Sequence, residues 1–446
     1  MALRACFIFL SLLLAPLAQA LDLGQCVELA LLQDANYQAA RAEARASREL
    51  VPQARAQLLP NLSASLARSK NQTDSEVPGF LGQRLSSSFE YMSATYNVAL
   101  RQPLYRKFNF AQYRQAEAQQ AGGEATLEKN LQDMLLRLSA AYFEALLADD
   151  QTALVRAQQL AIVGQLQAAK RSFESGMGTR TDIDDAQARY DLSVAQELEA
   201  RQNQAHARRQ LQTMINQPVT DLAALQPERM ELLPPNPAAA EEWVARSEAA
   251  NGELRALRAN IDAARQELEK ARAGHTPTVD LLLQRSRGLS QNDTTINQLY
   301  LTSQAGLQVN VPLFAGGYHL AAERQALANI DKASEQYEAR RRDIGLQVRR
   351  EFDNVAQGVF KVRALEQAQR SADQAVLSNQ KGYQAGTRSQ IDILNAEQQR
   401  MNARRDLAQA RYQYLLARLR LQAQAGSLDV EELSRINAWL GKGGAG

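Results

Sequence analysis

The chain has 446 residues, a formal net charge of +2 at pH 7 and a mean hydropathy of −0.40. This near-neutral charge offers no basic excess of the kind that nucleic-acid-binding proteins carry, and charges of both signs are interspersed as on solvated helix surfaces. Beyond the first twenty residues, no stretch is long and apolar enough for a transmembrane helix.

Residues 1–20 are expected to be a secretory signal peptide. Arg4 supplies a positive charge, residues 6–14 form a short apolar run, and residues 18–20 form a small-residue cleavage site. Cys26 would then be the single cysteine of the mature chain, so no disulfide framework is expected. It does not directly follow the cleavage site, as a lipid-anchor cysteine would. We therefore expect Cys26 to be a buried, small apolar residue near a helix start.

The mature chain is expected to contain two structural repeats, residues 21–215 and 239–426. A proline-rich linker at 216–238 joins them, and a C-terminal periplasmic tail follows at 427–446. A repeat of about 210 residues is far longer than a solenoid unit, so it indicates duplication of a whole structural half. The corresponding pairs include Arg41 and Arg258, Pro60 and Pro277, Pro103 and Pro312, and Asp182 and Asp392.

Each repeat is expected to contain the same elements in the same order. These are a helix, a strand, a polar loop, a returning strand, a long helix, a glycine-containing turn and a further helix. The first five are expected at Gly24–Leu58, Asn61–Ser69, Lys70–Ser88, Tyr91–Pro103 and Asn109–Ser172, and again at Glu241–Ala273, Thr278–Arg285, Ser286–Gln298, Leu301–Val311 and Tyr318–Lys381.

The returning strands alternate between apolar and polar side chains, as strands do when one face is apolar and the other meets water. At about ten residues, each has the length that a tilted strand needs to cross a bilayer. The face expected to contact lipid comprises Leu301, Ala305, Leu307, Val309 and Val311, with Met92, Ala94, Tyr96, Val98 and Leu100 as counterparts; Thr302, Gln304, Gln308 and Asn310 form the polar face.

The long helices contain no proline, and each would reach roughly 96 Å at about 1.5 Å per residue. Their apolar residues form a narrow stripe between charged flanks, which indicates coiled-coil packing. Four amphipathic strands cannot close a barrel, and an open sheet would leave unpaired backbone groups in hydrocarbon. The pattern therefore predicts that several copies of the chain close a barrel together, with long helices extending from it.

The chain resembles the TolC family of outer-membrane efflux and secretion channels over essentially the whole mature sequence. The motifs that carry the resemblance are Pro312-Leu-Phe-Ala-Gly-Gly317, Gly382-Tyr-Gln-Ala-Gly-Thr-Arg388 and Ile391-Asp-Ile-Leu-Asn-Ala396. The resemblance implies an α+β membrane protein of the cell outer membrane. A homotrimer would form a β-barrel of twelve strands, four from each chain, which is within the usual range for such barrels. A long periplasmic α-helical barrel of coiled coils would continue it.

The same resemblance implies the exit channel of a tripartite type I secretion system. Such a channel exports a protein substrate that an inner-membrane ABC transporter and a periplasmic adaptor deliver. One alternative is the outer-membrane channel of a multidrug or small-molecule efflux pump. Alternatives of another class are a periplasmic coiled-coil adaptor, which would not need two matching pairs of membrane-length strands, and a filamentous scaffold of long helices.

A gate is expected at the two glycine-containing turns, which would form the far periplasmic tip. Glycine permits the left-handed backbone of a chain reversal there, and Arg388 of one repeat could bind Asp182 of the other between neighbouring coils. By resemblance to the family, the latch residues are Thr181, Asp182, Tyr383 and Arg388, and the lumen constriction contains Asp392 and Asn395. Asn395 stands where the family often has a second carboxylate, which weakens the case for strong cation selectivity.

No catalytic constellation is found, so the chain is predicted not to be an enzyme and to need no cofactor. His206, His275 and His319 are scattered through the sequence without metal-ligand spacing. The polar loops at Lys70–Ser88 and Ser286–Gln298 are expected outside the cell, where an epitope tag near Asp74 would be detected on intact cells.

Overall fold

The computed structural model describes residues 20–78, 80 and 82–441. Residues 1–19 of the expected signal peptide and the last residues, 442–446, lie outside this described part. The chain divides into two compact units. Unit one contains the described residues up to 41 together with 127–254 and 340–441, and unit two contains 42–126 and 255–339. No helix within the described residues has the length and hydropathy needed to cross a membrane.

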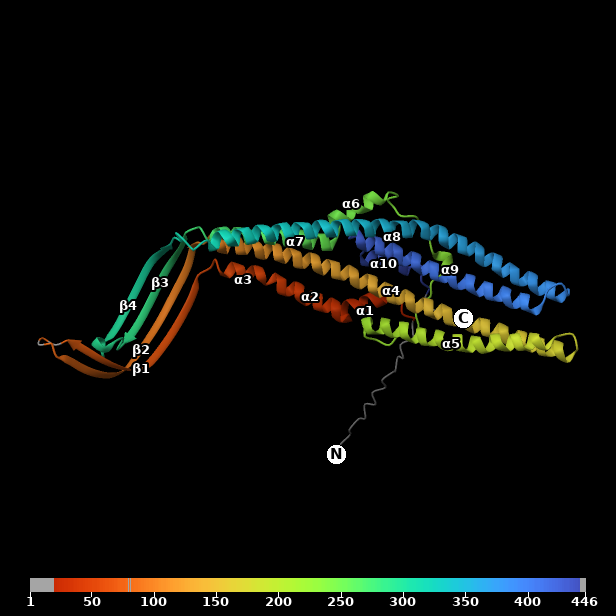
Figure 1. The fold of residues 1–446 in the computed structure, drawn as a ribbon, viewed down its shortest axis with the longest axis horizontal. Helices are drawn as coiled ribbons and strands as arrows, with labels where there is room; N and C mark the ends of the chain where they lie inside the picture. The colour runs from red at the N-terminus through yellow and green to blue at the C-terminus, as the bar shows by residue number, and fades with distance from the viewer. Residues whose placement is uncertain (1–19, 79, 81, 442–446) are drawn as a thin grey trace, which may run out of the picture. The chain divides into compact units, whose positions relative to one another are not determined.

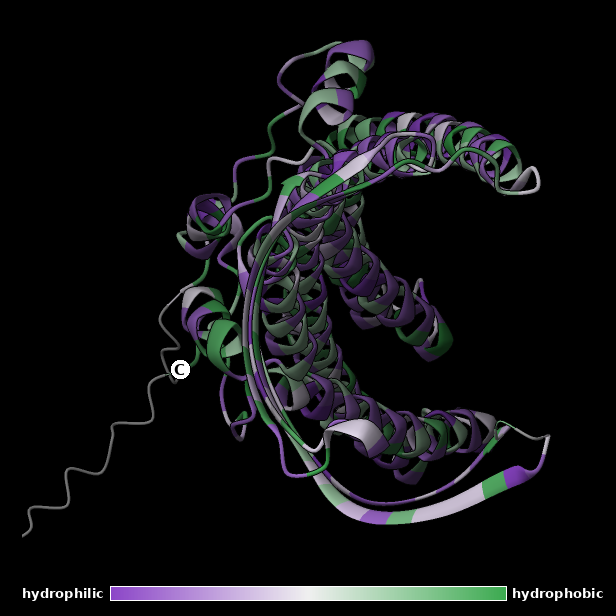
Figure 2. Ribbon diagram, turned by 90° about the vertical axis from the view of Figure 1, so that its left-hand side faces the viewer, coloured by the Kyte–Doolittle hydropathy of each residue, from purple (hydrophilic) through white to green (hydrophobic). Residues whose placement is uncertain are grey.

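Unit two contains a four-stranded antiparallel sheet in the order β1-β2-β3-β4. Its strands are β1 (Asn61–Pro78), β2 (Arg84–Tyr105), β3 (Thr278–Leu289) and β4 (Leu299–Asn310). The expected four strands per chain are therefore present, and β2 of the first repeat pairs directly with β3 of the second. The sheet curves strongly along its length and across its strands (Figures 1 and 2).

The pairing register places the expected apolar and polar sets on opposite faces of this sheet. The apolar face includes the row Leu62, Leu100, Leu283 and Ala305, in which each residue is opposite the next, and the polar face includes the row Ser63, Ala99, Gln284 and Gln304. Residues of the apolar face are solvent-exposed in the single chain: Leu62 is 68% and Leu307 62% exposed. A face of this composition can be buried only by lipid or by another apolar surface.

The expectation of a long loop at Lys70–Ser88 is wrong. Strands β1 and β2 stay paired as far as Pro78 and Arg84, so only residues 79–83 remain for the turn. Ion pairs Lys70–Glu90 and Arg84–Glu76, each at 3.2 Å, lie across this extension. The extension is mostly polar, and its few apolar residues, Val77, Leu85 and Phe89, do not form an alternating run that would reveal a strand. An insertion near Asp74 would therefore interrupt β1. Strand β3 also continues past the expected Arg285, and the connection to β4 contains the 3₁₀ turn η2 (Asp293–Thr295).

The first helix of each repeat is broken, contrary to the expectation of one continuous helix. One break in each repeat lies at equivalent residues, Asp34 and Asn251, which share the 217-residue offset (277 − 60) of Pro60 and Pro277. Each side chain caps the helix that follows: Asp34 accepts from the Tyr37 N–H at 2.7 Å, and Asn251 from the Leu254 N–H at 3.2 Å. Short polar side chains compete with helical hydrogen bonding in this way. A second break in the first repeat, at Glu49, has no counterpart in the second. The resulting helices are α1 (Leu23–Gln33), α2 (Ala35–Arg48) and α3 (Leu50–Ala56) in the first repeat, and α6 (Ala240–Ala250) and α7 (Gly252–Ala273) in the second.

The long helices are continuous, as expected. They are α4 (Lys107–Glu174) and α8 (Tyr318–Gln384), and they are followed by α5 (Arg180–Ile215) and α9 (Gln390–Gln424). Gly122 and Gly123 do not interrupt α4 but allow neighbours to approach it in unit two. A Cβ on Gly123 would lie 2.3 Å from the Ser47 hydroxyl oxygen, and one on Gly122 would lie 3.3 Å from the Ala259 Cβ. Glycine lowers the stability of a helix interior, and the close approach of neighbouring helices explains why Gly122 and Gly123 are found in α4.

In unit one, α4 and α5 form one antiparallel hairpin, and α8 and α9 form another (Figure 1). The core of this unit contains the fully buried side chains Tyr142, Leu211, Tyr414 and Leu415. Cys26 on α1 is also fully buried, as expected, and burial raises the pKa of its thiol to about 12.

The linker and the C-terminal segment are folded onto unit one. The linker contains η1 (Pro227–Arg229) and pairs with Leu21 and Leu440 through isolated bridges at Leu222 and Leu225. The C-terminal segment forms α10 (Val430–Asn437), which contacts α1. The Asn437 side chain accepts a hydrogen bond from the Leu23 N–H at 3.0 Å, so the start of α1 and the end of α10 are held together.

The junction between the sheet and the helices of unit two is built on Asp280. This β3 residue is 2% exposed. Its carboxylate accepts bonds from Arg101 on β2 at 2.7 Å and from Arg106, just before α4, at 2.6 Å. One acidic group of the second repeat thus binds two guanidinium groups of the first.

Candidate gate at the helical turns

The two helical hairpins of unit one end in turns of the same construction. Residues 175–179 join α4 to α5, and residues 385–389 join α8 to α9. Gly176 and Gly386 both have φ of +75°, the left-handed conformation that glycine adopts without a Cβ penalty. The N–H groups of Met177 and Thr387 each donate back to the carbonyl five residues earlier at 2.9 Å, which closes both helix ends.

Each turn leads into a helix through the same capping box. The Asp182 N–H donates to the Thr179 hydroxyl oxygen at 3.2 Å. In return, Asp182 Oδ2 accepts from the Thr179 N–H at 3.0 Å and from its hydroxyl at 2.7 Å. Asp392 and Ser389 repeat this arrangement at 3.3, 2.8 and 2.9 Å. These reciprocal bonds satisfy backbone donors that the first turn of a helix leaves free.

The hydrogen bonds of the capping box at Ser389 and Asp392 lower the pKa of the Asp392 carboxyl group. The Ser389 N–H, and then its hydroxyl, hold the pKa of the Asp392 carboxyl below its usual range. The positive charge of Arg388 acts in the same direction. These contacts therefore favour the ionised form of Asp392.

The two turns differ where the second carries the expected latch residues. At the offset that aligns Asp182 with Asp392, Tyr383 corresponds to Phe173 and Arg388 to Gly178. Tyr383 is 38% exposed, and the stem of Arg388 covers Gly382, where an added Cβ would lie 2.7 Å from the arginine Cγ. The second turn therefore carries a phenol and a guanidinium at the positions where the first has Phe173 and Gly178.

The structure places the six expected site residues in or beside these turns. Thr181 is exposed on the first turn of α5, and Asp182 is engaged by its own cap and not by Arg388 of the same chain. A bond from Arg388 to Asp182 between neighbouring chains stays a prediction. The six residues are Thr181, Asp182, Tyr383, Arg388, Asp392 and Asn395.

Arg189 on α5 is a contact residue that the sequence did not indicate. Its guanidinium donates to the Asn395 side-chain oxygen on α9 at 2.9 Å, between residues 206 positions apart. No local sequence signal marks such a pair. Asn395 therefore accepts a hydrogen bond from the neighbouring hairpin of its own chain. Because its amide is uncharged, Asn395 itself needs no counter-charge when this bond breaks.

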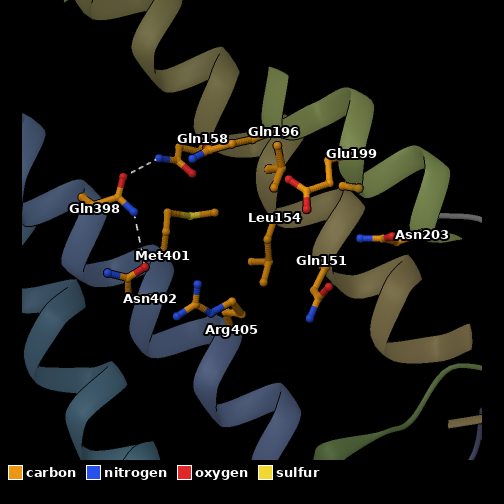
Figure 3. A pocket seen from close by; sticks show the side chains of 12 residues that line it. Gln151, Leu154, Gln158, Gln196, Glu199, Asn203, Gln398, Met401, Asn402 and Arg405 are labelled. Carbon is orange, nitrogen blue, oxygen red and sulfur yellow. Dashed lines mark hydrogen bonds between the residues drawn. The ribbon is translucent and has the colours of Figure 1, made fainter. Parts of the chain in front are cut away.

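Further polar contacts join the two hairpins along α9. Gln158 on α4 donates to Gln398 at 2.8 Å, and the Tyr412 hydroxyl donates to Asp150 on α4 at 2.8 Å. Between these contacts lies a cleft of about 260 Å³. Figure 3 shows that amide and charged side chains from α4, α5 and α9 surround it, with Leu154 and Met401 among them. The rings of Phe143 on α4 and Tyr412 on α9 also stack, with centroids 6.0 Å apart. The hairpins thus meet through an aromatic contact at one end and through polar bonds beside water-accessible space at the other.

The structure also brings together two of the histidines that are scattered in the sequence. The rings of His275 and His319, in unit two, are 5.0 Å apart, and His275 lies 3.3 Å from the Glu323 carboxylate. Within the described residues there is no group of three or more His, Cys, Asp or Glu side chains that could hold a metal ion.

Comparisons with known proteins identify a family and several relatives. The sequence model of the family "Outer membrane efflux protein" matches residues 26–217 and 243–427. The chain is 38% identical over 429 residues to the alkaline protease secretion protein AprF of Pseudomonas aeruginosa, covering 96% of this chain and 89% of the relative. It is 33% identical over 431 residues to the proteases secretion protein PrtF of Dickeya chrysanthemi, covering 95% and 92%.

Among solved structures, the outer membrane protein VceC from Vibrio cholerae has a similar fold. The TM-score is 0.78 at 18% sequence identity, and the match covers 91% of this chain and 96% of VceC. The sheet and the two long hairpins therefore form a known channel architecture.

Proposed function

Because this chain belongs to the outer membrane efflux protein family, as its resemblance to TolC-type channels predicted, we propose that it is the exit channel of a type I secretion system and that its substrate is a secreted protease. One observation carries this proposal: the chain is similar over nearly its whole length to two proteins named for protease secretion. Localisation in the outer membrane, with helices that extend into the periplasm, follows from the family.

A homotrimer is the assembly that best satisfies the sheet. Strands β1 and β4 lie at its two edges, and the apolar face of the sheet is exposed in the single chain. In a bilayer both edges need hydrogen-bonding partners, and β4 of one copy can supply them to β1 of the next. Three copies give about twelve strands, an ordinary size for an outer-membrane barrel. The partners of the trimer are a periplasmic adaptor and an inner-membrane ABC transporter, and neither nucleic acid nor a cofactor is involved.

The gate proposal rests on one carboxylate oxygen at the first turn. Both bonds from Thr179 end on Oδ2 of Asp182, so Oδ1 can accept a guanidinium from Arg388 of a neighbouring copy. Thr181 and Tyr383 lie beside these groups in their turns and complete the latch. Asp392 and Asn395 form the lumen constriction. Docking of the adaptor and transporter shifts the balance from the latched to the open state.

A drug efflux pump is the second candidate, because the family name itself refers to efflux. The adaptor alternative receives no support, since the matched family consists of outer-membrane proteins. A filamentous scaffold does not explain the sheet.

Complementation tests the proposal. The chain is expressed in a strain that lacks its own exit channel and carries a protease-secreting ABC transporter with its adaptor. We expect extracellular protease to appear and antibiotic resistance to stay unchanged. A matched control is Leu307→Arg, which places a charge on the lipid-facing sheet and should abolish secretion. Restored drug resistance without protease would favour the efflux pump instead.

A further inference from the structure

The outward, apolar face of the sheet ends in cations on two of its strands. On β1 the outward residue after Leu66 is Arg68, and on β3 the outward residue after Leu283 is Arg285. The next outward residues are Lys70 and Arg287. We use the term cation collar for Arg68, Lys70, Arg285 and Arg287.

The collar is duplicated with the chain. Arg68 and Arg285, like Lys70 and Arg287, are separated by 217 residues, the offset of Pro60 and Pro277 at the start of these strands (277 − 60). Both repeats therefore end the apolar run of their first strand with two outward cations at matching positions. A single surface arginine carries little information, whereas the same pair at equivalent sites of both halves indicates a common environment beside each strand.

Within the part of the chain that the structure describes, most of the collar has no acidic partner. All four side chains are exposed, and among the described residues Arg68, Arg285 and Arg287 make no ion pair. Lys70 contacts Glu90 on the neighbouring strand at 3.2 Å. Farther along the same face, Arg84 pairs with Glu76. The cations nearest the apolar band are thus the ones left without counter-charges.

The depth of these cations decides what can neutralise them. An arginine on the lipid face costs about 2–4 kcal/mol at the bilayer midplane but only about 0–1 kcal/mol near the interface. On β1 and β3 the collar directly follows the apolar run toward the hairpin end, while the residues opposite Arg285 and Arg287 on β2 are still apolar (Val98 and Tyr96). We therefore place the collar at the edge of the apolar band, where long arginine side chains can reach the lipid headgroups. Guanidinium groups bind phosphate oxygens through paired N–H donors, and this geometry suits them to phosphorylated headgroups.

We propose that the cation collar binds the phosphate groups of the glycolipid in the outward-facing leaflet of the outer membrane. The inference rests on the proposed function, because it requires the sheet to be part of a barrel in that membrane. Strands β1 and β3 are separated by β2 and so lie about 10 Å apart across the sheet. Their cations are also offset along the strands, because Arg68 is opposite Ala94 whereas Arg285 is opposite Val98. In the closed barrel, every second strand would carry a pair, and the pairs would encircle it.

Binding of a phosphorylated glycolipid to the purified full-length channel tests this proposal. The probes are bis-phosphorylated lipid A and the same glycolipid with its phosphates removed, each in neutral detergent micelles. We expect the wild-type channel to prefer the phosphorylated probe by about tenfold or more, as several charge-assisted bonds would give. The triple variant Arg68→Gln, Arg285→Gln and Arg287→Gln should lose this preference.

A control variant carries the same loss of charge elsewhere. Arg114→Gln, Arg171→Gln and Arg363→Gln remove three helical arginines outside the sheet and should keep the preference. Arg285→Gln alone, a milder change, gives a second reading if the triple variant assembles poorly, and it should weaken the preference partly. Conductance of the same preparations in planar bilayers reports separately on the channel itself.

The outcomes separate the two proposals. Equal binding of both probes by the wild type, or an unchanged preference in the triple variant, would overturn the collar even if conductance is normal. Equally tight binding of phosphatidylglycerol would replace the glycolipid by a glycerophospholipid and so contradict the proposed occupant. Absence of conductance from well-folded wild-type oligomers would instead contradict the proposed function.

Discussion

The sheet–helix junction and the helical turns hold their polar groups in opposite ways. At the junction, Asp280 binds Arg101 and Arg106 across 179 and 174 residues of sequence and is almost fully buried. At the turns, the bonds of Asp182 and Asp392 reach only three residues back, and both groups remain accessible.

This difference separates a fixed part of the molecule from an adjustable one. The junction bonds link the two repeats, so they can form only when both halves are in place, and breaking them leaves the buried Asp280 carboxylate without a partner. Each turn completes its bonds within one hairpin and needs nothing from its neighbours. Its remaining exposed groups are therefore available for contacts that form and break between chains.

Removing the acid of the junction should have the largest effect. Asp280→Ala leaves Arg101 and Arg106 without their shared acceptor and should destabilise the fold by about 3–5 kcal/mol. The effect should lie toward the lower end because the Arg101 side chain is half exposed. Urea unfolding and the yield of heat-resistant oligomer measure it. Asp392→Ala is the matched change at a turn, and an equal loss in both variants would remove the distinction between the two regions.

A charge on the lipid face of the sheet should have the next largest effect. Leu307→Arg near the bilayer midplane should cost about 2–4 kcal/mol, and Gln308→Arg should cost less because its side chain is on the polar face. The yield of assembled oligomer compares the two. Equal yields would contradict the assignment of the faces and with it the placement of the junction beside the membrane.

Loss of a helix cap should have a smaller and local effect. Thr179→Ala or Ser389→Ala removes one capping hydroxyl and should cost about 1 kcal/mol. Hydrogen exchange should accelerate in the turn that was changed, and the other turn and the sheet should keep their rates. Faster exchange at Asp280 in these variants would show that the turns and the junction are coupled.

The latch should change function with little change in stability. Exposed ion pairs contribute only about 0–1 kcal/mol each, but three equivalent pairs in a trimer act together. Arg388→Ser combined with Tyr383→Phe should raise resting conductance in planar bilayers and admit bulky antibiotics. Arg171→Ser, an exposed arginine change near the end of α4, is the control. Unchanged conductance in well-folded trimers of the double variant would contradict the latch.

An insertion in the β1–β2 turn should have the smallest effect on stability. An epitope tag placed between Gly82 and Gln83 would disturb no paired strand residue, so the oligomer yield should stay at the wild-type level. The tag should be detected by antibody on intact cells. The same tag at Asp74 interrupts β1 and serves as a control that should lower the yield. Detection of the turn tag only after permeabilisation would reverse the sidedness.

Much of this architecture could be predicted because its signals are local. The long helices follow from stretches without proline, and the strand faces follow from alternating side chains. The extension of β1 and β2 gave no such signal, since its few apolar residues, Val77, Leu85 and Phe89, do not form an alternating run. The helix breaks at Asp34 and Asn251 required knowledge of which short polar side chains cap a following helix.

In the candidate site too, only the features with a local sequence signal could be predicted. Its turns were predictable from Gly176 and Gly386, because a left-handed residue favours glycine. The bond between Arg189 and Asn395 and the cluster around Asp280 join residues far apart in sequence. One chain cannot reveal such pairs until the fold brings the partners together.

The burial of Cys26 makes the native thiol unreactive, so labelling experiments can use introduced cysteines without first replacing it. Thiol reagents attack the thiolate, and a pKa of about 12 leaves almost none of it while α1 stays packed. Labelling of the mature chain should therefore be slow, at a rate set by opening of the structure around α1. Because Cys26 reacts slowly, a single cysteine introduced at one of the turns would react much faster than the native thiol. Crosslinking between copies would then record which turns meet, and when they separate.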